Sequence, residues 1–419
     1  MKILIVTYSD RQGGAGKALL RIAGHLQACG QSVSVMVARR ESVSDLVDGP
    51  GRGWNGSAGQ ALRSLAARAI ICAATGSRAA DRSLGAFRGG LGKAINATDA
   101  DVVMLGWTGE ETISIGEIAE IKKPVVWRFS DMWPLLGTEH YASESEFVRY
   151  TVAGAGQIAG AWDLDARVFR RKLRLWRRAI PVIAPSRWMG ECVRRSAFAN
   201  TWPVRIVPTP VDTGVFAPRD RAAARRALGL PLDRRLIVFG ALGGDTDPRK
   251  GADLLAAATV TLRSSELACI IVGKDTPGRR AEFSLPTFDL GLINDDATLA
   301  GIYAAADVAV LPSRLDNLPQ FGLEAQACGC PVVTFDTGGL SDLVEDRVTG
   351  ALAEPFCVAD LAAAIRWVVS DQARLTALSH AARERALALW APEVVLPQYL
   401  DVFARAARGD FSLGTALVP

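Results

Sequence analysis

The sequence has little of what metal sites, disulfide frameworks and membrane spans require. It contains only three histidines, His25, His140 and His380, so few imidazole ligands are available for a protein-bound metal. Its seven cysteines are scattered, odd in number and mostly set among apolar neighbours, which favours reduced thiols over a disulfide framework. We find no apolar run of about 20 residues that could span a bilayer and no secretory signal at the N-terminus. We therefore expect a cytoplasmic protein without a bound metal.

The chain also lacks a strong excess of charge of either sign. Its formal net charge of +4 is too modest to indicate a nucleic-acid partner. At 419 residues it is too long for one ordinary domain but suits two, each able to bury a core. A hydrophobic fraction of 49% is typical of a globular α/β protein.

The stretch DRQGGAGKALL, residues 10–20, has the glycines and the lysine of a nucleotide-binding loop. A P-loop needs a glycine five positions before its Gly-Lys pair and a Ser or Thr after it, but Arg11 and Ala18 occupy these positions. Without that hydroxyl there is no Mg²⁺ ligand, which excludes an NTPase of this type. The G-x-G-x-x-G fingerprint is absent as well, which argues against a nicotinamide enzyme.

The surroundings of this stretch predict a β-loop-α-β unit. Residues 1–8 form an apolar run, apolar residues then recur at helical spacing up to Gly30, and residues 31–38 alternate as in a strand. Gly13 and Gly14 would let the backbone approach a ligand at the carboxyl end of a strand, where the start of a helix favours an anion. A tight turn without a ligand explains the same residues, and both interpretations stay open.

Strand-like runs separated by helix-compatible segments predict α/β structure throughout the chain. They lie at 101–107, 124–130, 181–186, 234–240, 268–273, 308–313 and 331–336. Four prolines crowd into residues 202–220, which marks a domain boundary. We predict two doubly wound domains, at 1–205 and 206–390, and a final helical part at 391–419 that crosses back to the first domain. The less regular region 49–92 is expected to hold a loop with one or two helices.

The most informative stretch is LPSRLDNLPQFGLEAQACGCPVVTFDTGG, residues 311–339. It places Asp316 in a loop after one strand and Glu324 at the start of a helix before the next, so both carboxylates would face one cleft. A carboxylate accepts two hydrogen bonds from the vicinal hydroxyls of a ribose or hexose, which suits a nucleotide-sugar. The alternative is a surface acid at Asp316 and a helix-start acid at Glu324 that the helix dipole favours.

This run resembles the acidic-x₇-acidic signature of retaining glycosyltransferases of family 4, which are enzymes of the GT-B fold. Further stretches match in the same order: the GGA loop near the N-terminus, PRKG at 248–251, VG at 272–273, LGLINDDATLAGIYAAADVAVLPS at 290–313 and FDTGGLSDLV at 335–344. Residues 124–141, PVVWRFSDMWPLLGTEHY, look like the exopolysaccharide and colanic-acid-type members. The resemblance implies two Rossmann-like domains facing a cleft, transfer with retention of anomeric configuration, and no metal or other cofactor.

The resemblance also implies a donor site in the second domain. The donor would be a nucleotide-diphosphate sugar of the UDP or GDP type, and Lys250 would neutralise the departing diphosphate because a metal-free enzyme needs a cation there. Asp316 would meet the donor sugar, and Glu324 would bind the ribose hydroxyls. The other donor-binding residues would be Gly14, Arg249, Gly291, Leu292, Asn317, Leu318 and Pro319.

The acceptor site is implied mainly in the first domain, at Gly13, Asp131 and His140. Asp131 would act in catalysis together with Lys250 and Asp316, and both Asp131 and His140 are candidates to orient the acceptor hydroxyl. For His140, a structural hydrogen-bonded role stays open as the alternative.

Three departures from the family pattern bear on activity. Gly244 stands where many members carry a second phosphate-binding arginine, and Arg249 either substitutes for it or points to solvent. Asp316 replaces the usual glutamate, so the carboxylate is one methylene shorter and a different sugar preference is expected. Ser130 stands where the relatives have a histidine associated with the reacting centre. Front-face retaining transfer tolerates this loss, because the departing phosphate can take the acceptor proton.

The stretch DARVFRRKLRLWRRAI, residues 165–180, combines many basic residues with an apolar helical face formed by Phe169, Leu173, Trp176 and Ile180. One interpretation is a helix packed on the sheet with a solvated basic side. The other is peripheral contact with an anionic membrane, where lipid-linked acceptors would lie.

The resemblance implies a metal-independent transferase that moves a sugar from a nucleotide-sugar to a glycan or lipid-linked acceptor in bacterial surface polysaccharide synthesis. It would be cytoplasmic, with peripheral contact at the inner face of the membrane as an option. The alternative is a non-catalytic GT-B protein that binds a nucleotide-sugar or glycan and partners another transferase. The absent histidine supports this alternative, whereas Glu324 and Lys250 favour the enzyme.

Overall fold

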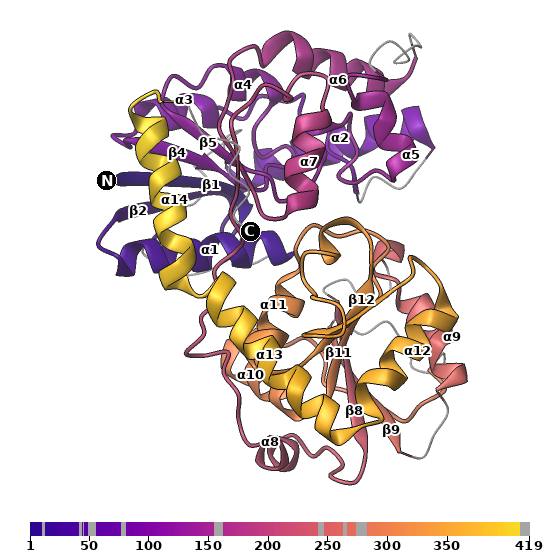
Figure 1. Cartoon of the computed structure of the whole chain (residues 1–419). Helices are drawn as coiled ribbons and strands as arrows, with labels where there is room; N and C mark the ends of the chain where they lie inside the picture. The colour runs from indigo at the N-terminus through magenta and orange to yellow at the C-terminus, as the bar shows by residue number, and fades with distance from the viewer. Residues whose placement is uncertain are drawn as a thin grey trace. The chain divides into compact units, whose positions relative to one another are not determined.

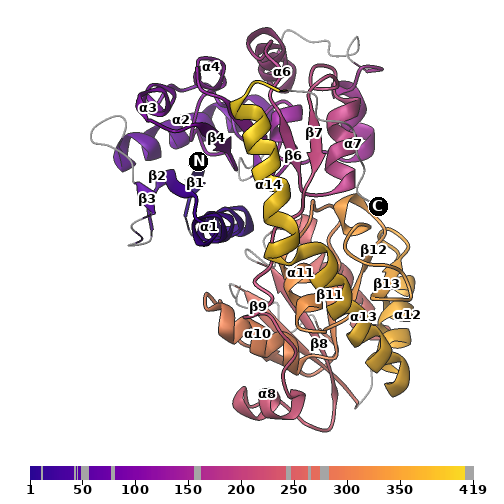
Figure 2. The same cartoon turned by 60° about the vertical axis from the view of Figure 1, so that its left-hand side comes forward.

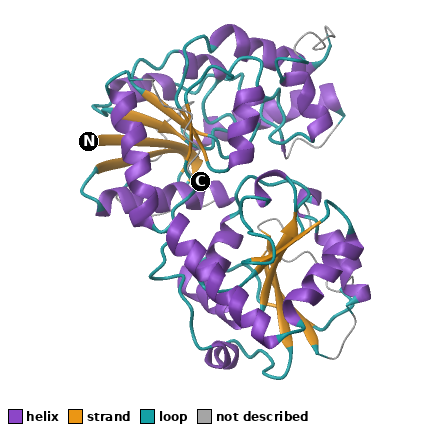
Figure 3. Cartoon of the chain, viewed as in Figure 1, coloured by secondary structure: helices purple, strands orange, loops and turns teal. Residues whose placement is uncertain are grey.

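The chain folds into two compact units, each a layer of strands with helices on both faces (Figures 1 and 3). The first unit comprises Met1–Val207 and Leu396–Pro419, and the second comprises Pro208–Val395. The structure is a computed structural model that describes residues 1–10, 13–41, 44, 46–48, 56–76, 81–154, 162–241, 247–262, 266–273 and 283–410.

The first unit is built on a seven-stranded sheet with the order β3-β2-β1-β4-β5-β6-β7, in which all neighbours run parallel. Its strands are β1 (Lys2–Ser9), β2 (Ser32–Arg39), β3 (Val47–Asp48), β4 (Val102–Leu105), β5 (Val125–Arg128), β6 (Val182–Ala184) and β7 (Val204–Ile206). β4 and β5 are buried along their whole length, as expected of a parallel sheet covered on both faces. The order reverses between β1 and β4, and open α/β sheets bind ligands at the carboxyl ends of strands beside such a switch point.

Helices connect these strands. They are α1 (Gly13–Ala28), α2 (Ser57–Thr75), α3 (Leu91–Ala97), α4 (Ile115–Ala119), α5 (Glu144–Phe147), α6 (Leu164–Leu175) and α7 (Arg187–Arg195), with the short 3₁₀ helices η3 (Trp133–Leu135) and η4 (Val148–Tyr150). In α1 the buried residues Leu19, Ile22 and Leu26 recur at helical spacing, as the sequence pattern predicts. α2 and the start of α3 supply the helices expected in the region 49–92.

The chain returns to the first unit through α14 (Pro392–Ala407), drawn in yellow in Figure 2. Arg128, at the end of β5, donates from Nε to the hydroxyl of Tyr399 at 3.1 Å, and both side chains are buried. The two units divide between Val207 and Pro208 and again between Val395 and Leu396, so the second division falls inside α14.

The second unit has a six-stranded parallel sheet with the order β10-β9-β8-β11-β12-β13. Its strands are β8 (Arg235–Ala241), β9 (Leu267–Gly273), β10 (Thr287–Asp289), β11 (Val308–Leu311), β12 (Val332–Phe335) and β13 (Gly350–Ala353). Numbered within the unit, this is the 3-2-1-4-5-6 order of the Rossmann fold. The predicted pair of doubly wound sheets is therefore present.

Two apolar cores flank this second sheet, because successive residues of a strand point to opposite faces. Leu236 and Val238 of β8 join a core with α10 and α11, whereas Ile237 and Phe239 join a core with α9 and α12 (Figure 1). The helices of this unit are α8 (Arg221–Ala227), α9 (Ala252–Thr261), α10 (Asp296–Ala305), α11 (Gln320–Ala327), α12 (Val358–Val369) and α13 (Gln372–Trp390), with the 3₁₀ helices η6 (Pro248–Lys250) and η8 (Gly338–Leu340).

All strand-like runs named from the sequence are strands, as β1, β2, β4, β5, β6, β8, β9, β11 and β12. The sequence pattern missed β3, β7, β10 and β13, each of two to four residues. Such short strands carry too few residues for a recognisable pattern, and β7 also follows Pro203 at the start of the proline-rich segment. Their pairing with a neighbouring strand decides their conformation.

All seven cysteines are free thiols. Cys29 and Cys72 are exposed, whereas burial raises the pKa of Cys192, Cys269 and Cys330 to about 12. The buried thiols are therefore unreactive near neutral pH. Within the described ranges, no helix combines the length and the apolar character needed to cross a membrane.

A buried carboxylate, Asp307, ties β11 to the preceding part of the second unit. It accepts from Arg225 Nη2 at 2.6 Å and from the backbone N–H of Leu236 at 2.7 Å. Arg221 and Arg235 complete its surroundings at 3.2 and 3.3 Å, and the Asp307 side chain is 1% exposed. One acid thus contacts three arginines from two segments.

We expect Asp307→Ala to lower the free energy of unfolding by about 3–5 kcal/mol, because Arg225 would stay buried without its counter-charge. Asp253→Ala is the matched control: it removes an exposed ion pair with Arg314 and should cost less than about 1 kcal/mol. Equilibrium unfolding in urea measures both. Equal losses for the two variants would contradict the anchoring role of Asp307.

Candidate active site

The loop after β8 brings a lysine to the carboxyl edge of the second sheet. Asp247 caps the short helix η6 by accepting from the backbone N–H of Arg249, and Gly251 then adopts φ +69°. A Cβ atom on Gly251 would lie 1.9 Å from the carbonyl oxygen of Pro312, which follows β11. Only glycine allows this approach, so the PRKG stretch is packed directly against the loop that contains Asp316.

Lys250 and Asp316 form an ion pair at this edge. Lys250 Nζ lies 2.5 Å from Asp316 Oδ2, and the carboxylate also accepts from the backbone N–H of Asn317 at 3.0 Å. Burial alone would raise the pKa of Asp316, but Lys250 and Arg249 favour its charged form and hold the pKa below its ordinary range. The structure therefore joins two residues that the sequence separates by 66 positions.

Arg249 points into the protein. Its Nη2 donates to Asp247 at 2.8 Å, its Nη1 donates to the carbonyl of Leu315 at 3.0 Å, and Nη1 lies 3.7 Å from Asp316. Of the two alternatives for Arg249, orientation toward solvent is wrong. Gly244, where the family arginine is missing, lies outside the described residues.

Glu324 lies in the second turn of α11 and is 4% exposed. Its Oε2 accepts from the hydroxyl of Tyr303 at 2.8 Å, and the Tyr303 ring packs edge-on against Phe321. Tyr303 lies in the stretch 290–313, where the sequence pattern gives no signal for a role of this residue. Tyr303 therefore fixes the orientation of the Glu324 carboxylate, which is predicted from the sequence to bind the ribose hydroxyls.

Four further residues predicted to bind the donor lie in loops of the same unit: Gly291, Leu292, Leu318 and Pro319. Gly291 adopts φ +68° and accepts from the backbone N–H of Gly273, which connects the loops after β9 and β10. Leu292 is 48% exposed, Leu318 packs against the core, and Pro319 is the residue before α11. In the part of the chain that the structure describes, no three His, Cys, Asp or Glu side chains gather as they would around a metal ion.

In the first unit, Gly13 and Gly14 are the first two residues of α1, which follows β1. Gly13 has φ +73°, a conformation that side-chain-bearing residues rarely adopt, and space is open beside both Gly13 and Gly14. Among the described residues, none blocks the N-terminus of α1 at these two glycines. Residues 11 and 12 lie outside the described part of the chain.

Asp131 is the centre of a hydrogen-bond network in the first unit. Its Oδ2 accepts from Trp107 Nε1 and from His140 Nδ1, each at 2.5 Å, and its Oδ1 accepts from the backbone N–H of Trp133 at 3.0 Å. His140 Nε2 lies 2.8 Å from Ser83 Oγ, which also accepts from the backbone N–H of Glu110. The structure thus brings Asp131 and His140 together, and it adds Trp107 and Ser83.

This network fixes the position of the His140 ring. A carboxylate only accepts, so Nδ1 carries the hydrogen of the contact with Asp131. Both ring nitrogens are engaged inside the protein, as the structural interpretation of His140 requires. Ser83 had no signal in the sequence, because it lies 57 positions from His140.

The loop next to this network is strained. Glu110 and Glu111 have φ of +55° and +56°, which is uncommon for residues other than glycine. Glu111 is buried and accepts backbone N–H bonds from Gly85, Ala86 and Phe87, and its burial raises its pKa. Such strain persists only where the surroundings impose it, and it concentrates at functional sites.

The basic stretch 165–180 differs from the prediction in two respects. α6 ends at Leu175 and not near Ile180, and one of its basic residues, Lys172, is completely buried. Lys172 Nζ donates to the carbonyls of Trp133, Leu136 and Gly137 and lies 4.0 Å from the centre of the Trp133 ring. Burial lowers the pKa of Lys172, and the three carbonyls and the ring offset that cost. The lysine thereby holds the segment between Asp131 and His140.

Residues 233–371 match the family model described as "Glycosyl transferases group 1". The matched region lies within the second unit. The match covers β8 to the end of α12, and it includes Lys250, Asp316 and Glu324.

Curated relatives of this chain bear the name D-inositol 3-phosphate glycosyltransferase. The protein of Geodermatophilus obscurus is 39% identical over 189 residues, which are 41% of this chain and 41% of the relative. That of Segniliparus rotundus is 32% identical over 195 residues, 44% of this chain and 43% of the relative. The chain thus spans less than half the length of these relatives.

Solved structures of similar fold match nearly the whole chain. Sucrose-phosphate synthase from Thermosynechococcus elongatus has a TM-score of 0.68 at 20% identity, over 98% of this chain and 100% of that one. Anabaena HepE in complex with UDP and glucose has a TM-score of 0.66 at 18% identity, over 96% and 99%. WaaG, a glycosyltransferase involved in lipopolysaccharide biosynthesis, has a TM-score of 0.59 at 17% identity, over 98% and 100%. These likenesses confirm the predicted GT-B fold.

We expect Asp316→Asn to destabilise the protein more near neutral pH than in acid. The folded pKa of Asp316 lies below its ordinary value of about 3.9, so the ion pair with Lys250 stabilises the fold above that value and is lost as the pH falls through the lowered pKa. The variant should lose about 1–3 kcal/mol at pH 6, and the loss should shrink below about pH 4. Urea unfolding of both proteins across this range measures the difference, and a loss independent of pH would contradict the pairing.

We expect Lys172→Met to lower the free energy of unfolding by about 2–4 kcal/mol, because buried carbonyls lose their donor. Lys123→Met is the control, since Lys123 donates to one carbonyl, that of Ala100, and should cost about 1 kcal/mol or less. Trp133 and Trp176 lie beside Lys172, so tryptophan fluorescence reports the change locally. An unchanged stability of Lys172→Met would show that the lysine does not hold this segment.

Proposed function

We propose that the protein is a retaining glycosyltransferase that moves a sugar from a nucleoside diphosphate sugar to a glycan or lipid-linked acceptor. The observation that carries this proposal is the ion pair of Lys250 with Asp316, followed along the chain by the buried carboxylate of Glu324 in α11. These three residues follow strands of a Rossmann-ordered sheet, inside the group 1 glycosyltransferase domain. They supply a cation for a diphosphate and carboxylates for sugar hydroxyls.

In the proposed donor site, Glu324 accepts hydrogen bonds from the ribose and Asp316 meets the transferred sugar. Lys250 then exchanges its contact with Asp316 for the diphosphate, since a dianionic group is the stronger partner for an ammonium. Asp316 becomes available for a sugar hydroxyl in the same step. Arg249 acts on the diphosphate only through its charge, because its guanidinium is bound to Asp247 and Leu315.

The nucleotide is proposed to be UDP or GDP, with Gly291 and Leu292 beside the base and Gly14 near the phosphates. The Anabaena structure of similar fold contains UDP and glucose, which supports a nucleotide of this kind. No metal or cofactor is assigned a role, because Lys250 supplies the positive charge that the leaving group needs.

In the proposed acceptor site, the Asp131–His140 pair shapes the wall and the departing phosphate takes the acceptor proton. Asp131 accepts three hydrogen bonds and both nitrogens of His140 are engaged, so neither group is arranged as a general base. Gly13 would approach the acceptor from the start of α1. This assignment fits a chain in which Ser130 stands where the exopolysaccharide and colanic-acid-type members of family 4 have a histidine.

We place the reaction in bacterial surface polysaccharide synthesis, at the cytoplasmic side of the membrane. The resemblance of residues 124–141 to exopolysaccharide and colanic-acid-type enzymes of family 4 supports this setting. The relatives named D-inositol 3-phosphate glycosyltransferase point instead to a phosphorylated polyol as acceptor. Both acceptors present a hydroxyl on a molecule that also carries phosphate.

A non-catalytic GT-B protein that binds the nucleotide-sugar and assists another transferase is the second candidate. Ser130 in place of the histidine and the inward orientation of Arg249 favour it, because both reduce the groups available to the reacting centre. It shares the donor site with the enzyme, so nucleotide binding does not separate the two candidates. Only the enzyme would transfer the sugar from the donor to an acceptor.

We expect one nucleotide among UDP, GDP and ADP to raise the unfolding midpoint of the wild type. A ligand at 100 times its dissociation constant stabilises by about 2.7 kcal/mol. Glu324→Ala should abolish the shift, whereas Glu393→Ala, at an exposed position of α14, should keep it. If no nucleotide shifts the midpoint, the donor site is wrong.

With the donor that binds, Lys250→Ala should reduce turnover by about 10²–10³-fold, as expected when a leaving-group cation is removed. Nuclear magnetic resonance of the product gives the anomeric configuration, which should equal that of the donor. Binding of the donor without turnover of donor and acceptor glycans would favour the non-catalytic candidate.

A further inference from the structure

Helix α2 of the first unit presents an uncharged apolar face to solvent. Leu62 and Leu65 on this face are 58% and 65% exposed, although exposed apolar patches are small on most monomeric proteins. The helix contains two charged residues, Arg63, which is buried, and Arg68, which pairs with Glu110. Neither the proposed donor site nor the proposed acceptor site uses this face.

The polar residues of α2 point into the protein and determine which side of the helix faces solvent. Arg63 donates from Nη2 to the side-chain oxygen of Gln60 at 2.6 Å. Ser64 donates to the carbonyl of Glu110 at 2.9 Å, and Gln60 donates to the same carbonyl. Because these bonds anchor one side of α2 on the loop of Glu110, the opposite, apolar side is held outward.

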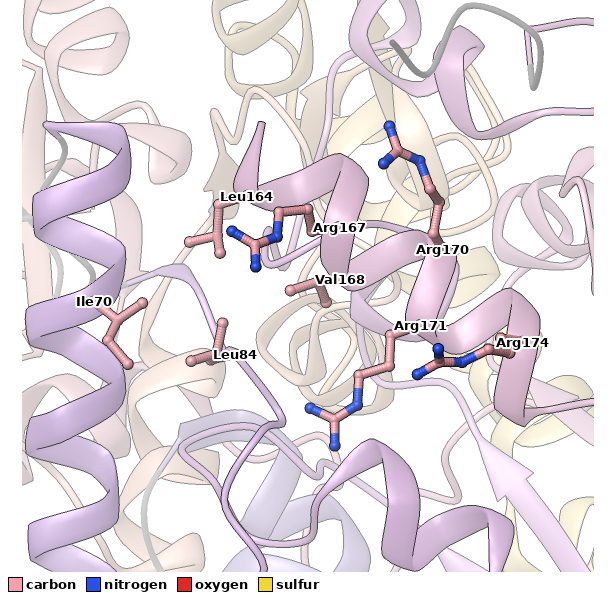
Figure 4. A pocket seen from close by; sticks show the side chains of 8 residues that line it. All are labelled: Ile70, Leu84, Leu164, Arg167, Val168, Arg170, Arg171 and Arg174. Atoms are coloured by element: carbon pink, nitrogen blue, oxygen red, sulfur yellow. The ribbon is translucent and has the colours of Figure 1, made fainter. Parts of the chain in front are cut away.

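A third side of α2 faces α6. Ile70 lines a pocket of about 590 Å³ between the two helices, and arginines of α6 line the same pocket (Figure 4). Leu62 and Leu65 are not part of this lining, since they lie on another side of the helix than Ile70. The outward face of α2 is therefore a separate surface.

The outward face of α2 follows a spacing of alternately four and three residues. Its seam consists of five exposed residues: Ala58, Leu62, Leu65, Ala69 and Cys72. A repeat of 3.5 residues keeps the seam along one side of the helix, and this is the pattern by which two helices pack side by side. The positions beside the seam carry small side chains that allow close approach: Ala61, Ala66 and Ala73.

A second copy of this helix suits the seam better than a membrane does. Helices that lie in a membrane interface combine bulky apolar residues with a rim of lysines and arginines. In the seam of α2, three of the five residues are small, and the two arginines of the helix are buried or paired. An identical helix brings no charge to this uncharged face, so the two faces are complementary.

We propose that two copies of the chain form a dimer through α2, with the two helices antiparallel and centred on Ala67. In this register Leu62 meets Cys72 of the partner subunit, and Leu65 meets Ala69 of the partner subunit. Each leucine then packs against a smaller residue, so the two seams interdigitate evenly. A parallel pair would place leucine on leucine and alanine on alanine, which leaves gaps at the alanines.

The size of the seam predicts a weak and reversible dimer. With 19 residues, α2 is about 28 Å long and about 10 Å wide, which offers roughly 300 Å² per copy. A stable interface buries about 800 Å² per partner, so we expect a dissociation constant on the order of 10–100 μM. The dimer does not depend on the proposed function.

Analytical ultracentrifugation of the full chain across this concentration range tests the dimer. The average mass should rise from 44.6 kDa toward twice this value. Leu62→Glu/Leu65→Glu should keep the protein monomeric, because a dimer would bury carboxylates without partners. The matched control is Val260→Glu/Leu387→Glu, which changes two hydrophobic residues of the second unit that are 55% and 41% exposed. It should dimerise as the wild type does.

Disulfide cross-linking tests the antiparallel register. In a Cys29→Ser background, which removes the other exposed thiol, Leu62→Cys should give a covalent dimer on oxidation, because position 62 faces Cys72 of the partner subunit. Adding Cys72→Ser should abolish this cross-link. Cys29→Ser alone should give none, since the two Cys72 residues of an antiparallel pair are about 15 Å apart along the helix axis.

Three results would overturn the proposal: a monomeric mass at every concentration, equal loss of the dimer in the α2 and control variants, or cross-linking of Cys29→Ser through Cys72 alone. Sedimentation with phosphatidylcholine vesicles that contain phosphatidylglycerol tests the other occupant. A monomeric wild type that binds these vesicles, while Leu62→Glu/Leu65→Glu does not, would assign the face to a membrane. An unchanged unfolding midpoint in every variant shows that the substitutions leave the fold intact.

Discussion

The parallel arrangement of the strands is the constraint on which the rest of this structure depends. In a parallel sheet every strand ends at the same edge, so the loops after the strands gather there whatever their separation in the sequence. In the second unit this brings Lys250, after β8, next to Asp316, after β11. In the first unit it brings Trp107, after β4, next to Asp131, after β5.

Charge is handled differently in the two units. In the second, the cations Lys250 and Arg249 are paired with Asp316 and Asp247, so their charge is neutralised within the unit. In the first, Lys172 is buried among carbonyls, while the arginines on the other side of α6 line a pocket. One helix therefore supplies both an internal anchor and the basic lining of a pocket.

Close packing fixes the loops that carry these charges. Gly251 lies where a side chain would collide with Pro312, and a side chain at Gly338 would meet the carbonyl oxygen of Asp316 at 2.9 Å. Both glycines have positive φ, at +69° and +58°. The conformation of the Asp316 loop is thus determined from two directions, which positions the carboxylate before any ligand binds.

The sequence by itself determined the fold class, because apolar runs of strand length alternate with helical patterns, and this periodicity depends only on neighbouring residues. It also singled out Asp316, Glu324 and Lys250, since a local motif carries them. It could not show that Lys250 binds Asp316, that Tyr303 holds Glu324, or that Ser83 reaches His140. Those contacts join residues 21 to 66 positions apart, and only the folding of the sheets brings such residues within hydrogen-bond distance.

The basic stretch of α6 shows the same limit most clearly. Its composition and spacing indicated a helix, but they placed Trp176 and Ile180 on a helix that ends at Leu175, and neither interpretation of the stretch separated Lys172 from the other basic residues. Tertiary packing alone decided that Lys172 turns inward to three carbonyls while Arg167, Arg171 and Arg174 line a pocket with α2. The reason is physical: a side chain's partner is set by what the rest of the chain packs against each face of its helix.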